Sequence, residues 1–216
     1  MGGIVTRNLP DQLVELLRER ILSGIAAPGD PVRQDALAAE LGVSKIPLRE
    51  AMARLEQEGL LRSEANRGYF VRELTAAEAR EVYDLRLNLE PAAAAAAAAN
   101  ATTEDREIAE AALEALDAAT EAHEAQVGVL NRAFHLALVR PARQSVTFEI
   151  IERLHILSER YVRKHLEPHG RDSRANREHR DLLDAWLARD GKTVSTLLSA
   201  HIGQTQDDLA RQLIDQ

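Results

Sequence analysis

The sequence contains no cysteine, and only 3% of its 216 residues are aromatic. The absence of cysteine excludes disulfide bonds, thiolate metal sites and cysteine nucleophiles. No apolar run approaches the roughly 20 residues of a membrane-spanning helix, and the N-terminus lacks the charged and then apolar pattern of a signal peptide. We therefore expect a cytoplasmic protein that has no membrane partner. Hydrophobic residues make up 45% of the chain, which favours a folded core over disorder.

An excess of basic charge is also missing, because 27 Lys and Arg face 35 Asp and Glu, for a net charge of -8. Taken alone, this balance argues against a nucleic-acid-binding protein, which usually carries a basic footprint. The acidity is unevenly distributed, however. Residues 1–75 contain 10 basic and 11 acidic residues, whereas residues 76–216 contain 17 and 24. The N-terminal part is therefore near neutral, and its DNA affinity would depend on dimerisation and specific contacts.

The pattern along the chain changes near residue 74. Before it lie short amphipathic segments, a Pro-Gly break and an Asn-Arg-Gly turn between apolar residues. After it the pattern is helical almost throughout, with few glycines. We expect two domains, residues 1–74 and 75–216. The fold class is mainly α, with an N-terminal winged helix-turn-helix and a small β-hairpin wing, followed by an all-α bundle of six to seven helices.

In the N-terminal part, the apolar spacing predicts helices over residues 11–24 and 34–41 and from Ser44 to about residue 58. Gly42 permits a sharp turn between the last two helices, and Ser44 is expected to cap the third helix. Two short strands, residues 60–63 and 69–72, form a β-hairpin. A helix, a glycine turn, a second helix and a hairpin together indicate a winged helix-turn-helix.

Such a domain places the exposed start of its third helix in the DNA major groove. Ser44, Lys45, Ile46 and Arg49 occupy that start, and Lys45 and Arg49 lie side by side where they can meet phosphates or guanine edges. The expected wing tip carries Arg67 and Gly68, where a small residue allows close approach to the DNA backbone or minor groove. Two alternatives remain open: a winged domain that binds proteins, and a solvated basic face.

Residues 10–72 resemble the GntR family of bacterial transcriptional regulators. The matching motifs include Pro28-Gly29-Asp30, Leu41-Gly42-Val43-Ser44-Lys45 and Asn66-Arg67-Gly68. The resemblance implies a homodimer on a pseudo-palindromic, double-stranded operator, with the third helix in the major groove and the wing tip in the minor groove. The DNA contacts that it implies are Arg33, Ser44, Lys45, Arg49 and Gly68. Ile46 stands where the family often has Thr, and its apolar side chain favours contact with a thymine methyl group.

In the C-terminal part, the pattern predicts helices over 75–100, 103–123, 125–139, 145–166, 173–189 and 193–214. Thr75 and Glu78 form a capping-box pattern at the start of the first of these helices. Eight consecutive alanines, residues 92–99, have high helix propensity and allow neighbouring helices to approach closely. We therefore read this run as part of a core helix rather than as a low-complexity segment.

Three of the seven histidines form a suggestive constellation with an asparagine. Asn131 and His135 lie on one helix face at i,i+4, while His179 and His201 occupy the last two helices. Three imidazoles and one side-chain oxygen that converge in a bundle suit a divalent transition metal such as Zn²⁺ or Ni²⁺. The alternative is that these histidines are satisfied within the core or lie on amphipathic helix faces.

Residues 76–214 resemble the FCD ligand-sensing domain of the FadR branch of GntR regulators. The motifs are Tyr83-x-x-Arg86-x-x-x-Glu90-Pro91, Phe134-His135 with Asn131, and Glu178-His179 followed by His201. The resemblance implies a metal held by Asn131, His135, His179 and His201, with small carboxylates as effectors. The family position of Asn131 can also hold Asp, so a neutral oxygen here implies weaker metal binding.

Arg86 is the natural partner of an effector carboxylate, because its planar guanidinium group can bind a carboxylate with two hydrogen bonds. The alternative is an i,i+4 salt bridge between Arg86 and Glu90 on the helix surface. Further candidate effector residues are Glu90, His155, Arg160 and Tyr161.

The sequence therefore favours a DNA-binding regulator whose operator affinity responds to a small carboxylate metabolite. A metal-dependent enzyme is a second possibility, but no His-Glu-x-x-His motif is present to supply an acid or base beside a metal. A metal-free regulator with another effector, and a helical scaffold with an inactive winged head, are further alternatives.

Overall fold

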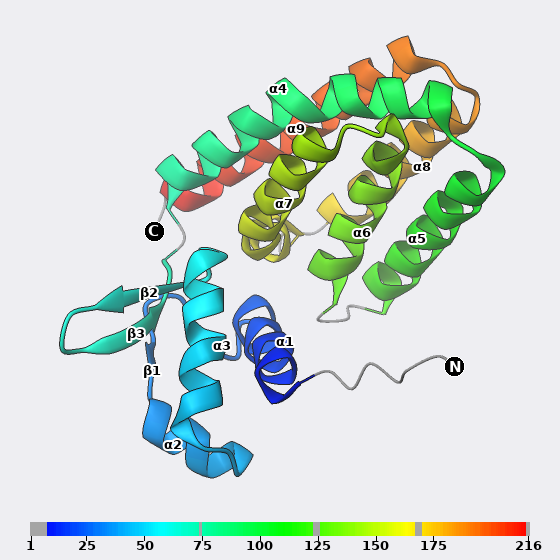
Figure 1. Ribbon diagram of the computed structural model, residues 1–216. Helices are drawn as coiled ribbons and strands as arrows, with labels where there is room; N and C mark the ends of the chain where they lie inside the picture. The colour runs from blue at the N-terminus through cyan, green and yellow to red at the C-terminus, as the bar shows by residue number, and fades with distance from the viewer. Residues whose placement is uncertain (1–7, 74, 123–125, 167–169, 215–216) are drawn as a thin grey trace, which may run out of the picture. The chain divides into compact units, whose positions relative to one another are not determined.

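The computed structural model describes residues 8–73, 75–122, 126–166 and 170–214, apart from the side chains of residues 160, 163–166 and 214 (Figure 1). The chain forms two compact units, residues 1–73 and 74–216. The described residues are mostly helical, and a three-stranded sheet lies in the first unit. The expected fold class is thereby confirmed.

The first unit packs three helices around one apolar core. They are α1 (Leu9–Leu22), α2 (Gln34–Leu41) and α3 (Lys45–Gln57). Gly42 ends α2 in the left-handed conformation, with φ of 64°, and this conformation allows the sharp turn into α3. The fully buried side chains of this core include Leu48, Met52, Leu55 and Leu60.

The sheet of the first unit has the strand order β1–β3–β2 and is antiparallel throughout. Its strands are β1 (Pro31–Val32), β2 (Leu61–Glu64) and β3 (Gly68–Val71). The expected hairpin of β2 and β3 is present, but β1 was not expected. A two-residue strand is too short to show the alternation by which strands are recognised, so only pairing with β3 defines it.

Two details of the expected helix starts differ in the structure. Ser44 has the extended backbone of an N-cap residue, but its side chain makes no capping hydrogen bond, so the expected cap is wrong in this respect. At the start of α4 (Ala76–Asn100), the Thr75 hydroxyl accepts from the Glu78 N–H as expected. The Thr75 N–H, however, donates to the Tyr161 hydroxyl rather than completing a capping box with Glu78.

The second unit is a helical bundle. Its helices are α4 (Ala76–Asn100), α5 (Thr103–Glu121), α6 (Val127–Val139), the short 3-10 helix η1 (Arg140–Ala142), α7 (Ser145–Leu166), α8 (Arg171–Leu187) and α9 (Gly191–Ile214). Helices α4 and α9 run side by side along much of their length (Figure 1). The alanine run explains this packing, because Ala93, Ala94, Ala97 and Ala98 are buried. A Cβ atom added at Gly191 would lie 3.2 Å from the backbone oxygen of Ala95.

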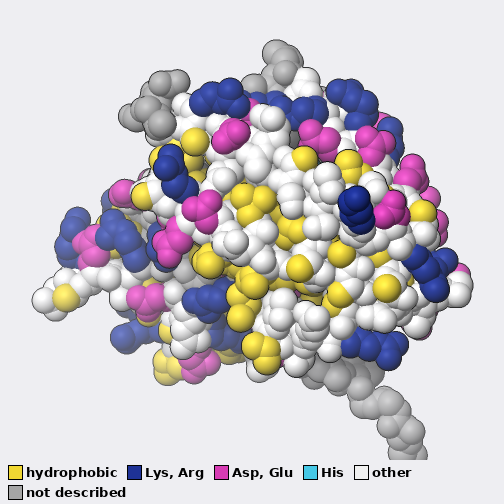
Figure 2. All heavy atoms as spheres, turned by 90° about the horizontal axis from the view of Figure 1, so that it is seen from above, with side chains coloured by type: hydrophobic (Ala, Val, Ile, Leu, Met, Phe, Trp, Pro, Cys, Tyr) yellow, Lys and Arg dark blue, Asp and Glu magenta, His cyan; other side chains and the backbone are white. Residues whose placement is uncertain are grey.

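The outer surface is mixed in character. Figure 2 shows hydrophobic side chains near the middle of one face, with Lys and Arg interspersed among Asp and Glu around them. No described helix is both long enough and apolar enough to cross a membrane.

Candidate functional site

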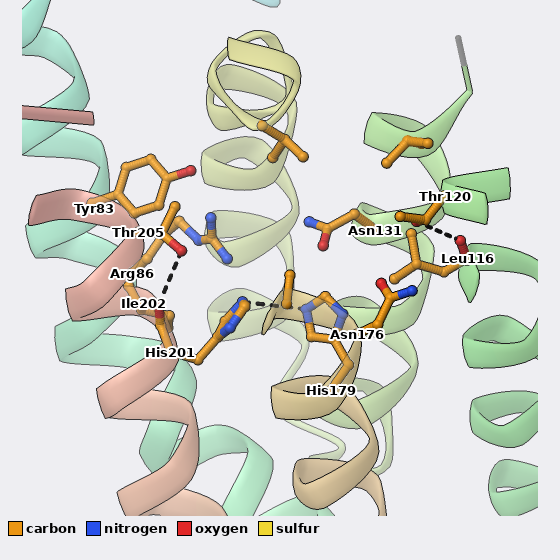
Figure 3. A pocket seen from close by; sticks show the side chains of 13 residues that line it. Tyr83, Arg86, Leu116, Thr120, Asn131, Asn176, His179, His201, Ile202 and Thr205 are labelled. Atoms are coloured by element: carbon orange, nitrogen blue, oxygen red, sulfur yellow. Dashed lines mark hydrogen bonds between the residues drawn. The ribbon is translucent and has the colours of Figure 1, made fainter. Parts of the chain in front are cut away.

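A small cavity of about 30 Å³ lies inside the helical unit (Figure 3). Six helices, α4 to α9, contribute its wall, since the chain returns repeatedly to the same level of the bundle. Its polar lining is supplied by Tyr83 and Arg86 of α4, Thr120 of α5, Asn131 of α6, Asn176 and His179 of α8, and His201 and Thr205 of α9. The cavity therefore offers polar groups from several helices in a space large enough for an ion or a few small atoms.

The three histidines of the sequence hypothesis converge beside this cavity. The Nε2 atoms of His179 and His201 are 3.3 Å apart, and the ring of His135 is centred 5.3 Å from each of the other two rings. One potential ligand atom from each histidine lies within 4.8 Å of the others. Zn–N bonds of about 2.0–2.1 Å in a tetrahedral site separate two ligand nitrogens by roughly 3.3–3.4 Å. The His179–His201 pair already has this separation.

His135 has the environment of a ligand residue rather than of a satisfied core histidine. Its side chain is 1% exposed, yet neither ring nitrogen has a hydrogen-bond partner among the described residues. Burial, followed by the charges of the neighbouring His155, His179 and His201, lowers its pKa well below the ordinary 6.5. The ring is therefore neutral at pH 7 and keeps a lone pair for a metal.

Asn131 lies on the cavity wall and directs its side chain toward the middle of the site (Figure 3). Asn131 is buried, with an exposed fraction of 8%. An amide supplies an oxygen but no negative charge, so three neutral imidazoles and one neutral amide would leave a bound cation with its full charge. The donor set fits a divalent transition metal, and it would attract a negatively charged ligand.

A second polar group, centred on Glu90, lies next to the first. Arg86 Nε is 2.6 Å from Glu90 Oε1, and Arg86 Nη2 is 3.4 Å from Glu90 Oε2. Arg86 also donates to Ser158, and His155 Nε2 lies 3.1 Å from Glu90 Oε1. The i,i+4 salt bridge considered from the sequence therefore exists, but its placement on the helix surface is wrong. Arg86 is 2% exposed and Glu90 is 0% exposed, because the face of α4 that carries them packs against other helices.

The ion pair determines the charge of Glu90. Burial alone would raise its pKa, but the charges of Arg86 and His155 and their hydrogen bonds outweigh burial and lower the pKa to about 2. The carboxylate is consequently ionised at neutral pH. The guanidinium of Arg86 also lies 4.9 Å from the centre of the Tyr83 ring.

The structure does not bring all of the candidate effector residues to the cavity. Arg86 lines the cavity, whereas Glu90 and His155 lie behind it in the ion-pair group. Tyr161 is buried, but its hydroxyl bonds to Thr75 and Glu78 at the start of α4. The side chain of Arg160 lies outside the described residues.

Glu178 is a contact that sequence reasoning missed. It directly precedes His179, and adjacent residues on a helix point in different directions, so the sequence does not indicate a contact with His201. In the structure, α9 brings His201 against it, with His201 Nδ1 2.7 Å from Glu178 Oε2. Only the packing of α8 against α9 shows this pairing.

In the first unit, all four candidate residues at the start of α3 are exposed, and the side chain of Ile46 is 71% exposed. Lys45 Nζ lies 2.5 Å from Asp35 Oδ1. Arg33 is exposed just before α2. At the wing, Arg67 pairs with Glu64, and Gly68 has a φ of 91°. The start of α3 and the wing tip of this unit are therefore exposed, as contact with a ligand requires.

Comparison with protein families gives two matches that together span most of the chain. Residues 9–71 match the bacterial regulatory proteins of the gntR family, and residues 81–204 match the FCD domain. The first match contains the exposed start of α3 and the wing, and the second contains the histidine cluster.

Individual relatives agree with these matches. The HTH-type transcriptional repressor RspR of Escherichia coli (strain K12) is 25% identical over 94% of this chain and 90% of its own length. The E. coli structure McbR/YncC has a TM-score of 0.80 at 26% identity, covering 95% of this chain and 98% of that one. The chain covers less than half the length of three further curated relatives. One of them is the uncharacterized HTH-type transcriptional regulator YdhC of Bacillus subtilis (strain 168). It is 38% identical over 82 residues, which are 38% of this chain and 37% of that protein.

Proposed function

Since the chain belongs to the GntR family of bacterial transcriptional regulators and carries an FCD domain, we propose that a small carboxylate bound beside a divalent metal in its helical unit controls its affinity for operator DNA. The family assignment makes the protein a DNA-binding transcriptional regulator and not an enzyme. The alternative of a metal-dependent enzyme is therefore set aside.

The histidine cluster supports the metal. Asn131, His135, His179 and His201 would hold it, and Zn²⁺ and Ni²⁺ are the best matches to three imidazoles and one amide oxygen. The observation that carries this proposal is His135, a fully buried imidazole whose two ring nitrogens find no hydrogen-bond partner in the described part of the chain. When bound, the metal would supply a positive centre that attracts carboxylate oxygens.

The cavity supports a small anionic effector. Arg86 presents its guanidinium group at the wall, so an incoming carboxylate would meet a second positive group beside the metal. The cavity volume of about 30 Å³ is far below that of a typical metabolite site. An acid of several carbon atoms must therefore displace wall side chains. Such an acid binds the displaced conformation more tightly than the closed one, and this difference in affinity can change the bundle.

In the homodimer that we propose, effector binding in the helical units can alter the affinity of the winged domains for DNA. Two winged heads in a homodimer must match half-sites whose separation is fixed by the pitch of the double helix. A small change in the preferred placement of the heads would then lower operator affinity, and operator DNA would lower effector affinity by the same factor.

The experiment that tests this function measures operator binding by fluorescence anisotropy with metal-loaded full-length protein. Operator fragments are selected from genomic DNA, and small mono-, di- and tricarboxylates are first screened by thermal shift. An acid that binds is expected to change operator affinity about 5- to 150-fold. Unchanged operator binding with every acid that binds the protein would contradict the proposal. The same effect after complete chelation of metal would favour a metal-free regulator.

The DNA-contact proposal makes a separate prediction for Arg49. Replacing Arg49 with alanine is expected to weaken operator binding about 5- to 150-fold, because one bidentate base contact contributes about 1–3 kcal/mol. Arg54→Ala is the matched control, since it removes the same charge from another exposed position of α3. Arg54 is paired with Asp11 and is not among the proposed contacts. Equal losses in the two variants in anisotropy titrations would show that Arg49 contributes only general charge.

A further inference from the structure

The two ring nitrogens of His201 face two different partners. Nδ1 lies 2.7 Å from Oε2 of Glu178, while Nε2 lies 3.3 Å from Nε2 of His179. A carboxylate oxygen can only accept a hydrogen bond, so the proton of a neutral His201 ring belongs on Nδ1. The lone pair of Nε2 is then directed toward His179 and the cavity, which His201 lines.

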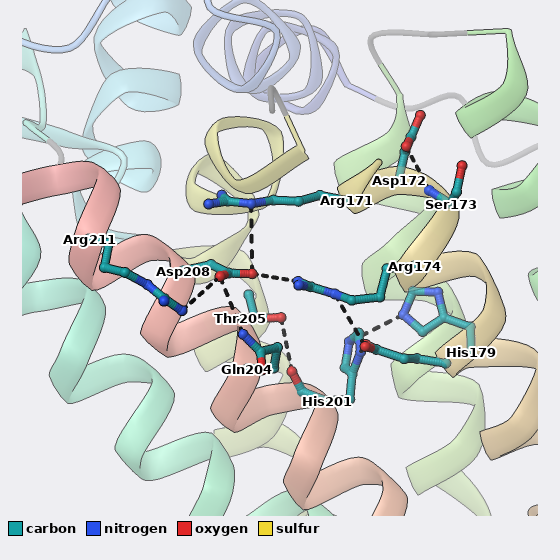
Figure 4. Close-up of polar contacts among 11 residues, drawn as sticks. Arg171, Asp172, Ser173, Arg174, His179, His201, Gln204, Thr205, Asp208 and Arg211 are labelled. Atoms are coloured by element: carbon teal, nitrogen blue, oxygen red, sulfur yellow. Dashed lines mark hydrogen bonds and ion pairs between the residues drawn. The ribbon is translucent and has the colours of Figure 1, made fainter. Parts of the chain in front are cut away.

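Glu178 is itself held in place through its other oxygen. Oε1 of Glu178 lies 3.3 Å from Nε of Arg174, one helical turn earlier on α8. The same guanidinium group binds Asp208 on α9, which is only 5% exposed (Figure 4). Gln204 and Arg211 also contact Asp208. The carboxylate that faces His201 is therefore positioned by a chain of contacts that ends on a buried group.

A purely structural ion-pair network that ties α8 to α9 is the simpler interpretation of these contacts. It does not explain why the two oxygens of Glu178 face different partners, Oε1 facing Arg174 and Oε2 facing His201. It also does not account for the direction of His201, whose outer nitrogen meets the carboxylate while its inner nitrogen meets His179. A carboxylate behind an imidazole fixes the tautomer and the ring orientation that ligand binding requires.

We propose that Glu178 is a positioning residue that holds His201 in the Nδ1–H tautomer and thereby presents an unprotonated Nε2 to the site. Arg174 and Asp208 hold Glu178 in turn. The part of this inference that concerns metal affinity rests on the proposed function, but the tautomer of His201 does not.

The tautomer is read in the metal-free, full-length protein labelled with ¹⁵N-histidine, because nitrogen chemical shifts distinguish protonated from unprotonated ring nitrogens. The His201→Gln variant assigns the signal. We expect Nδ1–H in the wild type, loss of this preference in Glu178→Ala, and its retention in Glu178→Gln, whose amide oxygen still accepts. Asp181→Ala, an exposed carboxylate on the same helix, is the matched control and should change nothing. A proton on Nε2 in the wild type, or an unchanged tautomer in Glu178→Ala, would overturn the proposal.

Zinc affinity, measured by calorimetry on the same proteins, separates this inference from the proposed function. Glu178→Ala is expected to weaken Zn²⁺ binding about 10- to 100-fold, and Asp181→Ala should bind as the wild type does. A wild type that binds no Zn²⁺ would refute the metal part of the proposed function, while the nitrogen spectra would still decide the role of Glu178. Equal Zn²⁺ affinities in the wild type and Glu178→Ala would refute the positioning role in metal binding.

Discussion

Replacing His179 with alanine is expected to abolish tight binding of a divalent transition metal, whereas replacing His155 with alanine should leave it in place. The two histidines belong to different groups of potential ligands. His179 joins His135 and His201, while His155 joins His135 and Glu90. Both histidines are buried, with exposures of 3% and 1%, so the two substitutions are matched in residue type and in burial.

The existing partners distinguish the two groups. Both oxygens of Glu90 already face the guanidinium of Arg86, so a cation at the Glu90 group would have to compete with a buried ion pair. The group that contains His179 consists of three imidazoles, and the two Nε2 atoms of His179 and His201 have the separation of two ligands on one metal.

Metal content by elemental analysis and Co²⁺ affinity by absorption titration measure the outcome. Thermal unfolding of each metal-free variant shows whether it is folded. Because His135 belongs to both groups, His135→Ala should lose the metal in either case. Loss of metal in a folded His155→Ala variant, with retention in His179→Ala, would move the site to the Glu90 group. Wild-type protein that binds no transition metal would refute the site altogether.

Replacing Glu90 with glutamine is expected to lower the free energy of unfolding by about 3–5 kcal/mol. The substitution keeps the shape of the side chain but removes the only formal negative charge that the structure pairs with Arg86 among the described residues. A guanidinium group at 2% exposure then remains buried without a counter-charge, which costs more than a lost surface salt bridge. Urea denaturation monitored by circular dichroism measures the change.

Two further variants make the test specific. Glu81→Gln changes an exposed glutamate on the same helix and should alter stability by less than about 0.5 kcal/mol. Arg86→Leu combined with Glu90→Leu removes both charges and should be more stable than Glu90→Gln, since no buried charge is left unpaired. A Glu90→Gln protein as stable as the Glu81→Gln control would show that the ion pair is not enclosed as the structure has it.

Acid unfolding provides the second readout of Glu90. Its pKa in the folded protein is about 2, against an ordinary value of 4.5, so the unfolded chain binds the proton first as the pH falls. The stabilisation from Glu90 is complete above about pH 4.5 and is lost progressively toward pH 2. The lowered pKa values of His135 and His155 act in the same direction from about pH 6.5 downward, because the unfolded chain again takes up protons first. The Glu90→Gln variant should lack the lower of these two pH-dependent losses.

Local patterns in the sequence were sufficient to predict the helices, the hairpin and the family, but not the strand β1. Apolar spacing located the helices of both units to within a few residues, since an amphipathic helix records its buried face in every turn. Gly42 marked the turn of the helix-turn-helix because a left-handed conformation favours glycine. The i,i+4 spacing of Asn131 and His135 placed both residues on one face of a helix, and that face is determined locally.

Only the tertiary structure decided which faces meet. Whether Arg86 and Glu90 form an exposed salt bridge or a buried ion pair depends on the helices that pack against their face of α4, and the same i,i+4 spacing is compatible with both. The pairing of Glu178 with His201 joins residues 23 positions apart on different helices. The sequence therefore determined the helices, the hairpin, the charge distribution and the candidate ligands, because these depend on neighbouring residues. Burial, orphaned nitrogen atoms and the division into two polar groups depend on packing between distant helices, so they required the folded bundle.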